Sequence, residues 1–218
     1  MSQLTLDFGP PPAADFDNFV AGANRECLET LRSLVERLRG GFEPPCRFIY
    51  VWGPAGCGKS HLAAALTAQG IGRLAVVDDC QRLTAAAQQA LFHRFDRIAQ
   101  AAGEALVTFG DAPPARLPLM PELGSRLGWG IVFALEPLAD GDLTAAIERT
   151  ARERGLLIAP DLPAYLLTHT RRDMASLKTI LDRLDRLSLE QRRPVSLAML
   201  RALLKGEPAH QDPRCPIE

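Results

Sequence analysis

A glycine-rich segment that ends in lysine and serine is the part of this sequence best suited to chemistry. Residues 53–60 fit the pattern G-x-x-x-x-G-K-[ST] at every position. Glycines let successive backbone N–H groups turn toward phosphate oxygens, and a helix that follows adds its positive dipole end. Lys59 can then reach the β- and γ-phosphates, and the Ser60 hydroxyl can ligate Mg²⁺. The segment predicts a nucleotide site formed by Gly53, Pro54, Ala55, Gly56, Cys57, Gly58, Lys59, Ser60 and the adjoining His61.

Two aspartates, Asp78 and Asp79, follow a short apolar run over residues 74–77. Such a run is typical of a strand that is buried on both faces of a sheet. Acids at the end of such a strand suit the metal site that accompanies a phosphate loop. Asp78 would hold Mg²⁺, and Asp79 would lie beside the attacking water. The alternative is an acidic turn that merely ends the strand.

Alternating strand and helix patterns surround these residues up to Pro137 and favour a parallel sheet flanked by helices. Strand patterns cover residues 47–52, 74–79, 104–109 and 131–135. Helix patterns cover residues 25–39, 59–69 and 84–102, where Thr84 is a candidate cap, and a short helix or turn surrounds Ser125. Beyond Asp140 only helical patterns follow, over residues 142–154, 160–168, 174–189 and 196–204. These predict a small, all-helical second domain.

Composition narrows the class of protein. Of the 218 residues, 47% are apolar and 23% are charged, which is usual for a globular protein. A net charge of −1 argues against a protein that coats nucleic acid. The five cysteines show no CxxC spacing, so neither a zinc site nor a disulfide framework is expected. No signal peptide or membrane span is expected either, and the prediction is a cytoplasmic protein.

Blocks in a fixed order make this chain resemble the DnaA-related branch of the AAA+ ATPases over residues 16–205. They read FDNFVAGAN, FIYVWGPAGCGKSHL, LAVVDDCQ, ALFHRFDRI, VTFGDAPPARL, PELGSRLGWG, RGLLIAPDLPAYLL and RRDMASLKTILDRLD. The resemblance implies an α/β fold with a P-loop AAA+ parallel sheet, plus a helical lid domain. It implies four parts: a peptide and tether (residues 1–15), the nucleotide-binding domain (16–137), the lid (138–205) and a disordered tail (206–218).

The resemblance also implies roles for single residues. Phe19 and Val20 would contact the adenine, and Asp111 would be a polar sensor. Arg126 would be an arginine finger that acts in trans, on the nucleotide of a neighbouring subunit. Arg172 would be the second sensor, carried by the lid. The alternative for both arginines is a solvated surface side chain.

Two differences from the branch pattern bear on function. The span between Lys59 and Asp78 is short, so a strand and helices that usually lie there are expected to be missing at one edge of the sheet. The residues after the lid are expected to be too few for the helix-turn-helix domain that binds duplex DNA in the initiator protein DnaA. Both differences point away from sequence-specific DNA binding and from an origin-melting protein.

The N-terminal residues offer a docking peptide. Residues 3–8 read QLTLDF and fit QLxLxF, which is similar to the peptide that docks on the bacterial DNA polymerase sliding clamp. Leu6 and Phe8 would fill an apolar pocket, Leu4 would cover its edge and Gln3 would form amide hydrogen bonds. Three prolines then form an extended tether. The alternative is a strap that lies on the protein's own surface.

Together these features predict a regulator of replication initiation whose partners are DnaA and the sliding clamp. It would stimulate ATP hydrolysis by DnaA through Arg126 and leave inactive ADP–DnaA, while holding ADP or ATP with Mg²⁺ itself. One alternative is a self-sufficient AAA+ ATPase of the clamp-loader or helicase-loader type. Another is an adaptor without a nucleotide role. The sequence leaves open which nucleotide is bound and whether the chain hydrolyses ATP alone. It also leaves open whether the protein is a monomer or a homodimer, and how the short span between Lys59 and Asp78 affects pairing with a partner protein.

Overall fold

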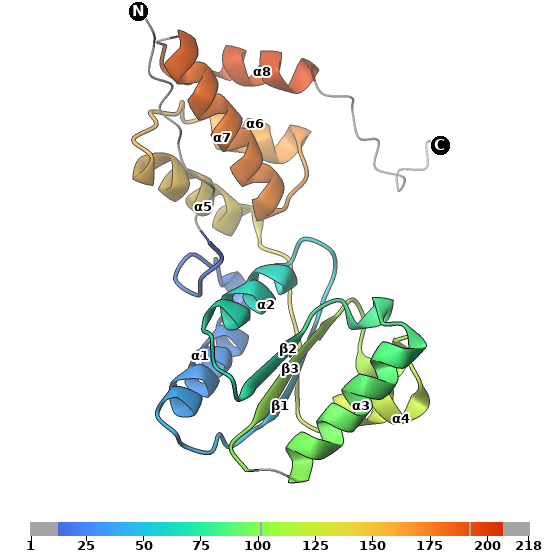
Figure 1. Ribbon diagram of the computed structural model, residues 1–218. Helices are drawn as coiled ribbons and strands as arrows, with labels where there is room; N and C mark the ends of the chain where they lie inside the picture. The colour runs from blue at the N-terminus through green and yellow to red at the C-terminus, as the bar shows by residue number, and fades with distance from the viewer. Residues whose placement is uncertain (1–12, 101, 192, 207–218) are drawn as a thin grey trace, which may run out of the picture. The chain divides into compact units, whose positions relative to one another are not determined.

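The computed structural model describes residues 13–100, 102–191 and 193–206. The predicted clamp peptide and the predicted disordered tail after Gly206 lie outside these residues. The chain divides into two compact units, residues 1–137 and 138–218 (Figure 1). Within the described residues, no helix is both long enough and apolar enough to cross a membrane.

A parallel sheet of four strands forms the centre of the first unit, as the alternating patterns predict. The strands are β1 (Phe48–Trp52), β2 (Leu74–Val77), β3 (Ala105–Gly110) and β4 (Ile131–Ala134), in the order β2-β3-β1-β4. The register pairs Phe48 with Leu106, Ile49 with Ile131 and Leu74 with Ala105. Every residue of β3 is buried, since this strand is paired on both sides and covered on both faces.

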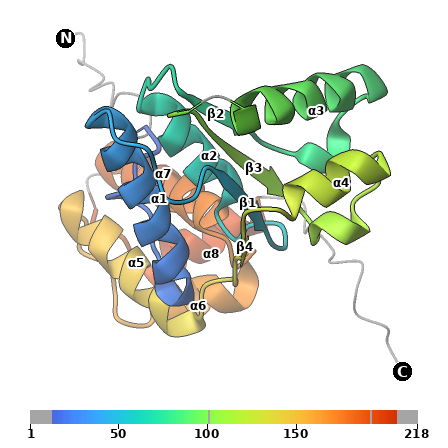
Figure 2. The same ribbon diagram turned by 90° about the horizontal axis from the view of Figure 1, so that it is seen from below.

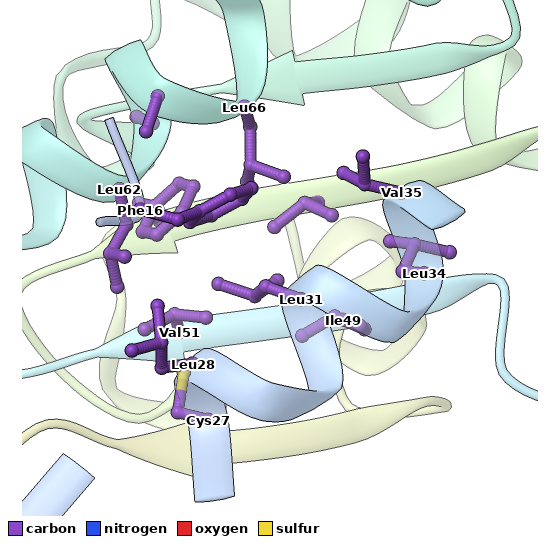
Figure 3. Packing of buried hydrophobic residues seen from close by; sticks show 14 of the residues in the cluster. Phe16, Cys27, Leu28, Leu31, Leu34, Val35, Ile49, Val51, Leu62 and Leu66 are labelled. Atoms are coloured by element: carbon purple, nitrogen blue, oxygen red, sulfur yellow. The ribbon is translucent and has the colours of Figure 1, made fainter. Parts of the chain in front are cut away.

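Helices cover the two faces of this sheet (Figures 1 and 2). The helices α1 (Arg25–Arg39) and α2 (Lys59–Ala68) pack on one face, and α3 (Ala85–Gln100) and α4 (Pro121–Leu127) pack on the other. Short 3-10 turns occur at Gly22–Asn24 (η1), Cys80–Arg82 (η2) and Pro114–Arg116 (η3). The apolar stripe of α1 faces Ile49 and Val51 of β1 and Leu62 and Leu66 of α2, as Figure 3 shows. This packing fixes the start of α2, and with it the phosphate loop.

The start of β1 differs slightly from the prediction, whereas the cap of α3 agrees with it. Arg47 precedes β1 instead of starting it, and its guanidinium donates to the carbonyl oxygens of Ile98 and Ala99 at the end of α3. Thr84 caps α3 as expected, because its Oγ1 accepts a hydrogen bond from the Ala87 amide at 3.3 Å.

The acidic strand β2 forms one edge of the sheet. Helix α2 ends at Ala68 and β2 begins at Leu74, so the connection is too short to contain a further strand. The predicted reduction of the sheet at one edge agrees with this arrangement. The acids that follow β2 therefore lie at a border of the sheet.

The second unit consists of the helices α5 (Asp140–Glu153), α6 (Leu162–His169), α7 (Met174–Gln191) and α8 (Leu197–Lys205), as predicted. Its core consists mainly of leucines that these four helices contribute. The Ser196 hydroxyl caps α8 by accepting from the Met199 amide. An ion pair between Arg154 and Asp182 joins the end of α5 to α7. This unit therefore has a core of its own.

Candidate nucleotide site

The phosphate loop, residues 53–60, connects the carboxyl end of β1 to α2. Gly56 and Gly58 have φ values of 83° and 100°, a left-handed conformation that favours glycine. A Cβ at Gly58 would lie 2.6 Å from the Phe19 ring, and one at Gly53 would lie 2.6 Å from the Leu135 carbonyl oxygen. The glycines are therefore required both for the turn and for the close packing around it.

Lys59 points its ammonium group back across this loop. Its Nζ donates to the carbonyl oxygens of Gly53 at 2.7 Å and Pro54 at 2.8 Å. The Cys57 thiol lies 3.8 Å from the same nitrogen. A phosphate bound in the loop would offer charged acceptors to an ammonium that already lies over it. The loop and its lysine therefore fit a nucleotide.

The segment expected on the adenine side lies against the phosphate loop. The Phe19 ring contacts Gly58 and lies 5.6 Å from the His61 ring, between centroids. His61 Nε2 is 2.9 Å from the carbonyl oxygen of Asp15, which holds the segment to the start of α2. Val20 is half-buried in the same segment. The structure thus brings Phe19 and His61 to the loop.

The two aspartates occupy the turn after β2. Asp79 has a φ of 52°, the only positive value for a non-glycine residue in the described part of the chain. The Asp78 carboxylate accepts a hydrogen bond from the Asp79 amide at 2.8 Å. The Asp79 carboxylate accepts from Gln81 at 2.9 Å and pairs with Arg82 at 3.6 Å. The two carboxylates therefore have different partners: Asp78 accepts from the backbone of the turn, and Asp79 interacts with the side chains of Gln81 and Arg82.

A magnesium ion needs few protein ligands, because it retains several waters. Ser60 is exposed in the first turn of α2, and Asp78 directly follows β2, which packs beside α2. A hydroxyl and a carboxylate on neighbouring elements are oxygen donors of the type that Mg²⁺ prefers. Ser60 and Asp78 are therefore the residues that would hold it.

Asp111 follows β3 at the carboxyl edge of the sheet and is exposed. Beside it, the buried Tyr50 hydroxyl donates to the Ala112 carbonyl oxygen at 2.6 Å. Burial raises the pKa of Tyr50, and Cys80 and Asp111 add to the effect. A Cβ at Gly110 would lie 2.0 Å from the Tyr50 oxygen, so this contact requires glycine. Sequence reasoning missed Tyr50, because its position in an apolar strand indicates only the core.

Arg126, near the end of α4, does not have the solvated surroundings considered as the alternative. Its Nε lies 3.4 Å from the Asp96 carboxylate, and its side chain is only 27% exposed. The guanidinium carbon lies 3.9 Å from the centroid of the Trp129 ring. Sequence reasoning missed both Asp96 and Trp129. A side chain held in this way has a defined direction.

Arg126 and the phosphate loop lie toward opposite ends of β1. Trp129 meets the buried Phe95 ring edge-on at 5.9 Å, and Phe95 stacks on Phe48 at 3.9 Å. Phe48 is the first residue of β1, whereas the phosphate loop follows the last. Five residues at roughly 3.3 Å each give β1 a length of about 16 Å. In this conformation Arg126 is remote from the phosphate loop of its own chain.

Arg172 belongs to the second unit, just before α7. Its Nη1 pairs with the Asp140 carboxylate at 3.3 Å, and its Nε donates to the Leu167 carbonyl oxygen at 3.3 Å. The side chain is 62% exposed. These contacts link the start of α5 to the end of α6, within the helical unit.

Comparison with known proteins shows what the helical unit and the whole chain are similar to. Residues 140–204 match the family model described as the Hda lid domain. Domain III of the replication initiation protein DnaA from Thermotoga maritima superposes with a TM-score of 0.72 at 18% identity, covering 89% of this chain and 98% of that one. The helical unit therefore matches an Hda-type lid, and the chain as a whole has the fold of DnaA domain III.

Two further structures share this fold. AMPPCP-bound DnaA from Aquifex aeolicus has a TM-score of 0.67 at 22% identity, and the match covers 82% of this chain and 66% of that one. The RuvB Holliday junction branch migration motor from Thermotoga maritima has a TM-score of 0.65 at 16% identity, over 88% and 71% of the two chains. The Hda-type lid comprises α5 to α8, so it is the whole helical unit.

Replacing Lys59 with alanine is expected to weaken nucleotide binding by about 10- to 100-fold, because the loop loses its charged donor to the phosphates. Calorimetric titration with ADP and with ATP measures the change. Lys205→Ala, which removes an exposed lysine from α8, is the matched control. Equal affinities of the Lys59 variant and the unmodified protein would contradict the assignment.

Two buried cysteines are expected to resist alkylation. Burial raises the pKa of Cys27 and of Cys80 to about 12. At pH 8 only about one thiol in 10⁴ is then the reactive thiolate. Iodoacetamide treatment followed by peptide mass analysis should leave both unmodified until denaturant is added. The partly exposed Cys46 is the internal comparison. Rapid modification of Cys27 or Cys80 in the folded chain would contradict their described burial.

Proposed function

We propose that this protein regulates replication initiation by supplying Arg126 to the ATP of a DnaA partner. The position of Arg126, remote from the phosphate loop of its own chain, supports action in trans. An arginine placed at a γ-phosphate stabilises the charge that develops during phosphoryl transfer and is worth about 10³ to 10⁵ in rate. The product is ADP–DnaA, so the proposed effect on initiation is negative.

The proposed role of the chain's own nucleotide is structural and regulatory. Phe19, Val20 and His61 would hold the adenine side, the phosphate loop would hold the phosphates, and Asp111 and Arg172 would act as sensors. The AMPPCP-bound DnaA from Aquifex aeolicus supports an adenine nucleotide as the ligand class. Mg²⁺ would be held by Ser60 and Asp78, and Asp79 would face the water beside the terminal phosphate.

The proposed location of the activity is the sliding clamp. Gln3, Leu4, Leu6 and Phe8 would dock on it, and the prolines that follow would act as a tether. Clamp docking would restrict the activity to DNA that is already being copied. This part of the proposal depends on the sequence, because the peptide lies outside the described residues.

A titration tests the proposal. ATP hydrolysis by purified DnaA is measured against increasing amounts of this protein, with and without clamp loaded on DNA. Hydrolysis should rise with the added protein and should rise further with loaded clamp. A protein that leaves DnaA hydrolysis unchanged in both arms contradicts the proposal. Steady ATP turnover by this protein alone, rising with its own concentration, would instead support a self-sufficient ATPase.

A further inference from the structure

The surroundings of Arg126 hold its guanidinium by one edge and one face. The Asp96 carboxylate, on α3, lies 3.4 Å from Nε. The Trp129 ring lies under the planar group, with 3.9 Å between the guanidinium carbon and the ring centroid. Phe92 and Phe95 add more distant aromatic rings, at 5.7 Å and 6.0 Å. A charged partner at Nε and a ring under the plane together fix both the position and the tilt of the group.

The opposite edge of the guanidinium is free for a ligand. Its terminal nitrogens, Nη1 and Nη2, form no hydrogen bond to any of the described residues, and the ion pair with Asp96 is given by Nε. These two nitrogens form the fork that binds phosphate oxygens in a bidentate manner. A half-buried arginine with a purely structural role would be expected to donate hydrogen bonds from Nη1 and Nη2 to other groups of the protein. Here the protein uses the Nε edge instead.

The support for Trp129 extends into the core. The residue is 61% exposed, yet its ring meets Phe95 edge-on, and Phe95 is buried and stacks on Phe48 of β1. The series Phe48, Phe95, Trp129 therefore connects the central sheet to the guanidinium. A ring that is anchored on one side and exposed on the other can keep Arg126 in place while a partner approaches.

We infer that Asp96 and Trp129 are positioning residues that hold Arg126 with its Nη1 and Nη2 edge directed toward a phosphate on a second polypeptide. The inference rests on the proposed function and adds the device that orients the arginine. Neither residue needs to touch the partner's nucleotide. Their effect is to reduce the motion that Arg126 must lose when it forms the contact.

Asp96→Ala and the nearly isosteric Asp96→Asn test this inference. Each should lower the maximal rate of stimulated ATP hydrolysis by DnaA about tenfold, while the concentration of this protein at half-maximal stimulation changes less than about twofold. Asp96→Glu should restore part of the rate. Glu122→Ala, which removes an exposed acid from the first turn of α4, is the matched control and should leave the rate unchanged.

Trp129 is tested in the same assay. Trp129→Leu should lower the maximal rate to a similar extent, and Trp129→Phe should restore much of it, because a ring face is again available to the guanidinium. Thermal unfolding of each variant establishes that it is folded at the assay temperature. The role of Trp129 is overturned if the maximal hydrolysis rates of the variants correlate with their thermal stabilities and do not depend on whether residue 129 has an aromatic ring.

A spectroscopic signal tests the geometry without a partner. The Nε–H resonance of Arg126, assigned through its loss in Arg126→Ala, should be shifted by the Trp129 ring and should exchange slowly with water. Both properties should be reduced in Trp129→Leu, and Asp96→Asn should speed the exchange. An Nε–H that exchanges as fast as that of the exposed Arg94 overturns the inference.

The two proposals fail in different ways. If Arg126→Ala is inactive while Asp96→Ala and Trp129→Leu stimulate as well as the unmodified protein, the positioning role is wrong and the proposed function stands. If Arg126→Ala stimulates normally, the proposed function is wrong and the positioning role falls with it.

Discussion

Arg126→Ala is expected to lower stimulated ATP hydrolysis by DnaA by about 10³ to 10⁵, which removes nearly all of the activity. This corresponds to about 4 to 7 kcal/mol of lost transition-state stabilisation. The expected loss is large because the guanidinium would stabilise the charge that develops at the γ-phosphate during phosphoryl transfer. Single-turnover hydrolysis of labelled ATP bound to DnaA, at saturating concentrations of this protein, measures the effect.

The variant should otherwise behave as the unmodified protein does. Its affinity for ADP should be unchanged, since Arg126 is remote from the phosphate loop of its own chain. Arg94→Ala removes an exposed arginine from α3, near Asp96, and should keep full stimulation. Full stimulation by the Arg126 variant would falsify the trans-acting role.

Gly130→Ala is expected to destabilise the first unit by about 3 kcal/mol or more. A Cβ at this position would lie 1.8 Å from the Phe48 carbonyl oxygen and 2.6 Å from its carbonyl carbon. Both atoms belong to the backbone of β1, so no side-chain rotation relieves the clash. The start of β4 must then move away from β1. Urea unfolding followed by circular dichroism measures the loss as a lower midpoint.

The neighbouring Gly128 provides a close control. A Cβ at Gly128 would lie 3.5 Å from the Ser125 carbonyl oxygen, which is an ordinary contact, and its φ is −84°. Gly128→Ala should therefore be neutral or slightly stabilising, by less than about 1 kcal/mol. Equal midpoints for the two variants would show that Gly130 is not constrained as described. Gly130→Ala should also disturb Arg126, since residue 130 follows Trp129 directly.

The parts of the fold that the sequence predicts best are those whose signals are local. The stripe of Leu28, Leu31, Leu34 and Leu38 in α1 and the glycines of the phosphate loop lie within short windows, and each window dictates its own geometry. The change at Asp140 from mixed to purely helical patterns was equally visible. In each case neighbouring residues along the chain supply both the signal and the structural constraint.

The surroundings of Arg126 could not be predicted in this way. Asp96 lies on a different helix, and the ring series from Phe48 to Trp129 joins three separate segments of the chain. The periodic pattern of apolar residues does not predict which surface of α3 packs against the end of α4. The left-handed backbone of Asp79 could not be predicted either, because most aspartates adopt other conformations and the sequence does not show which one will be left-handed.

The separation of Arg126 from the phosphate loop along β1 gives the molecule a polarity. In the proposed function, one end of the sheet would donate an arginine, and the other end would accept a nucleotide. Two surfaces that lie at opposite ends cannot meet their counterparts reciprocally across a single two-fold axis. The proposed interface, between the donor end of this protein and the nucleotide of DnaA, would therefore be heterologous, or head to tail. It would leave the accepting end of this protein open, so each contact would act in one direction on one nucleotide.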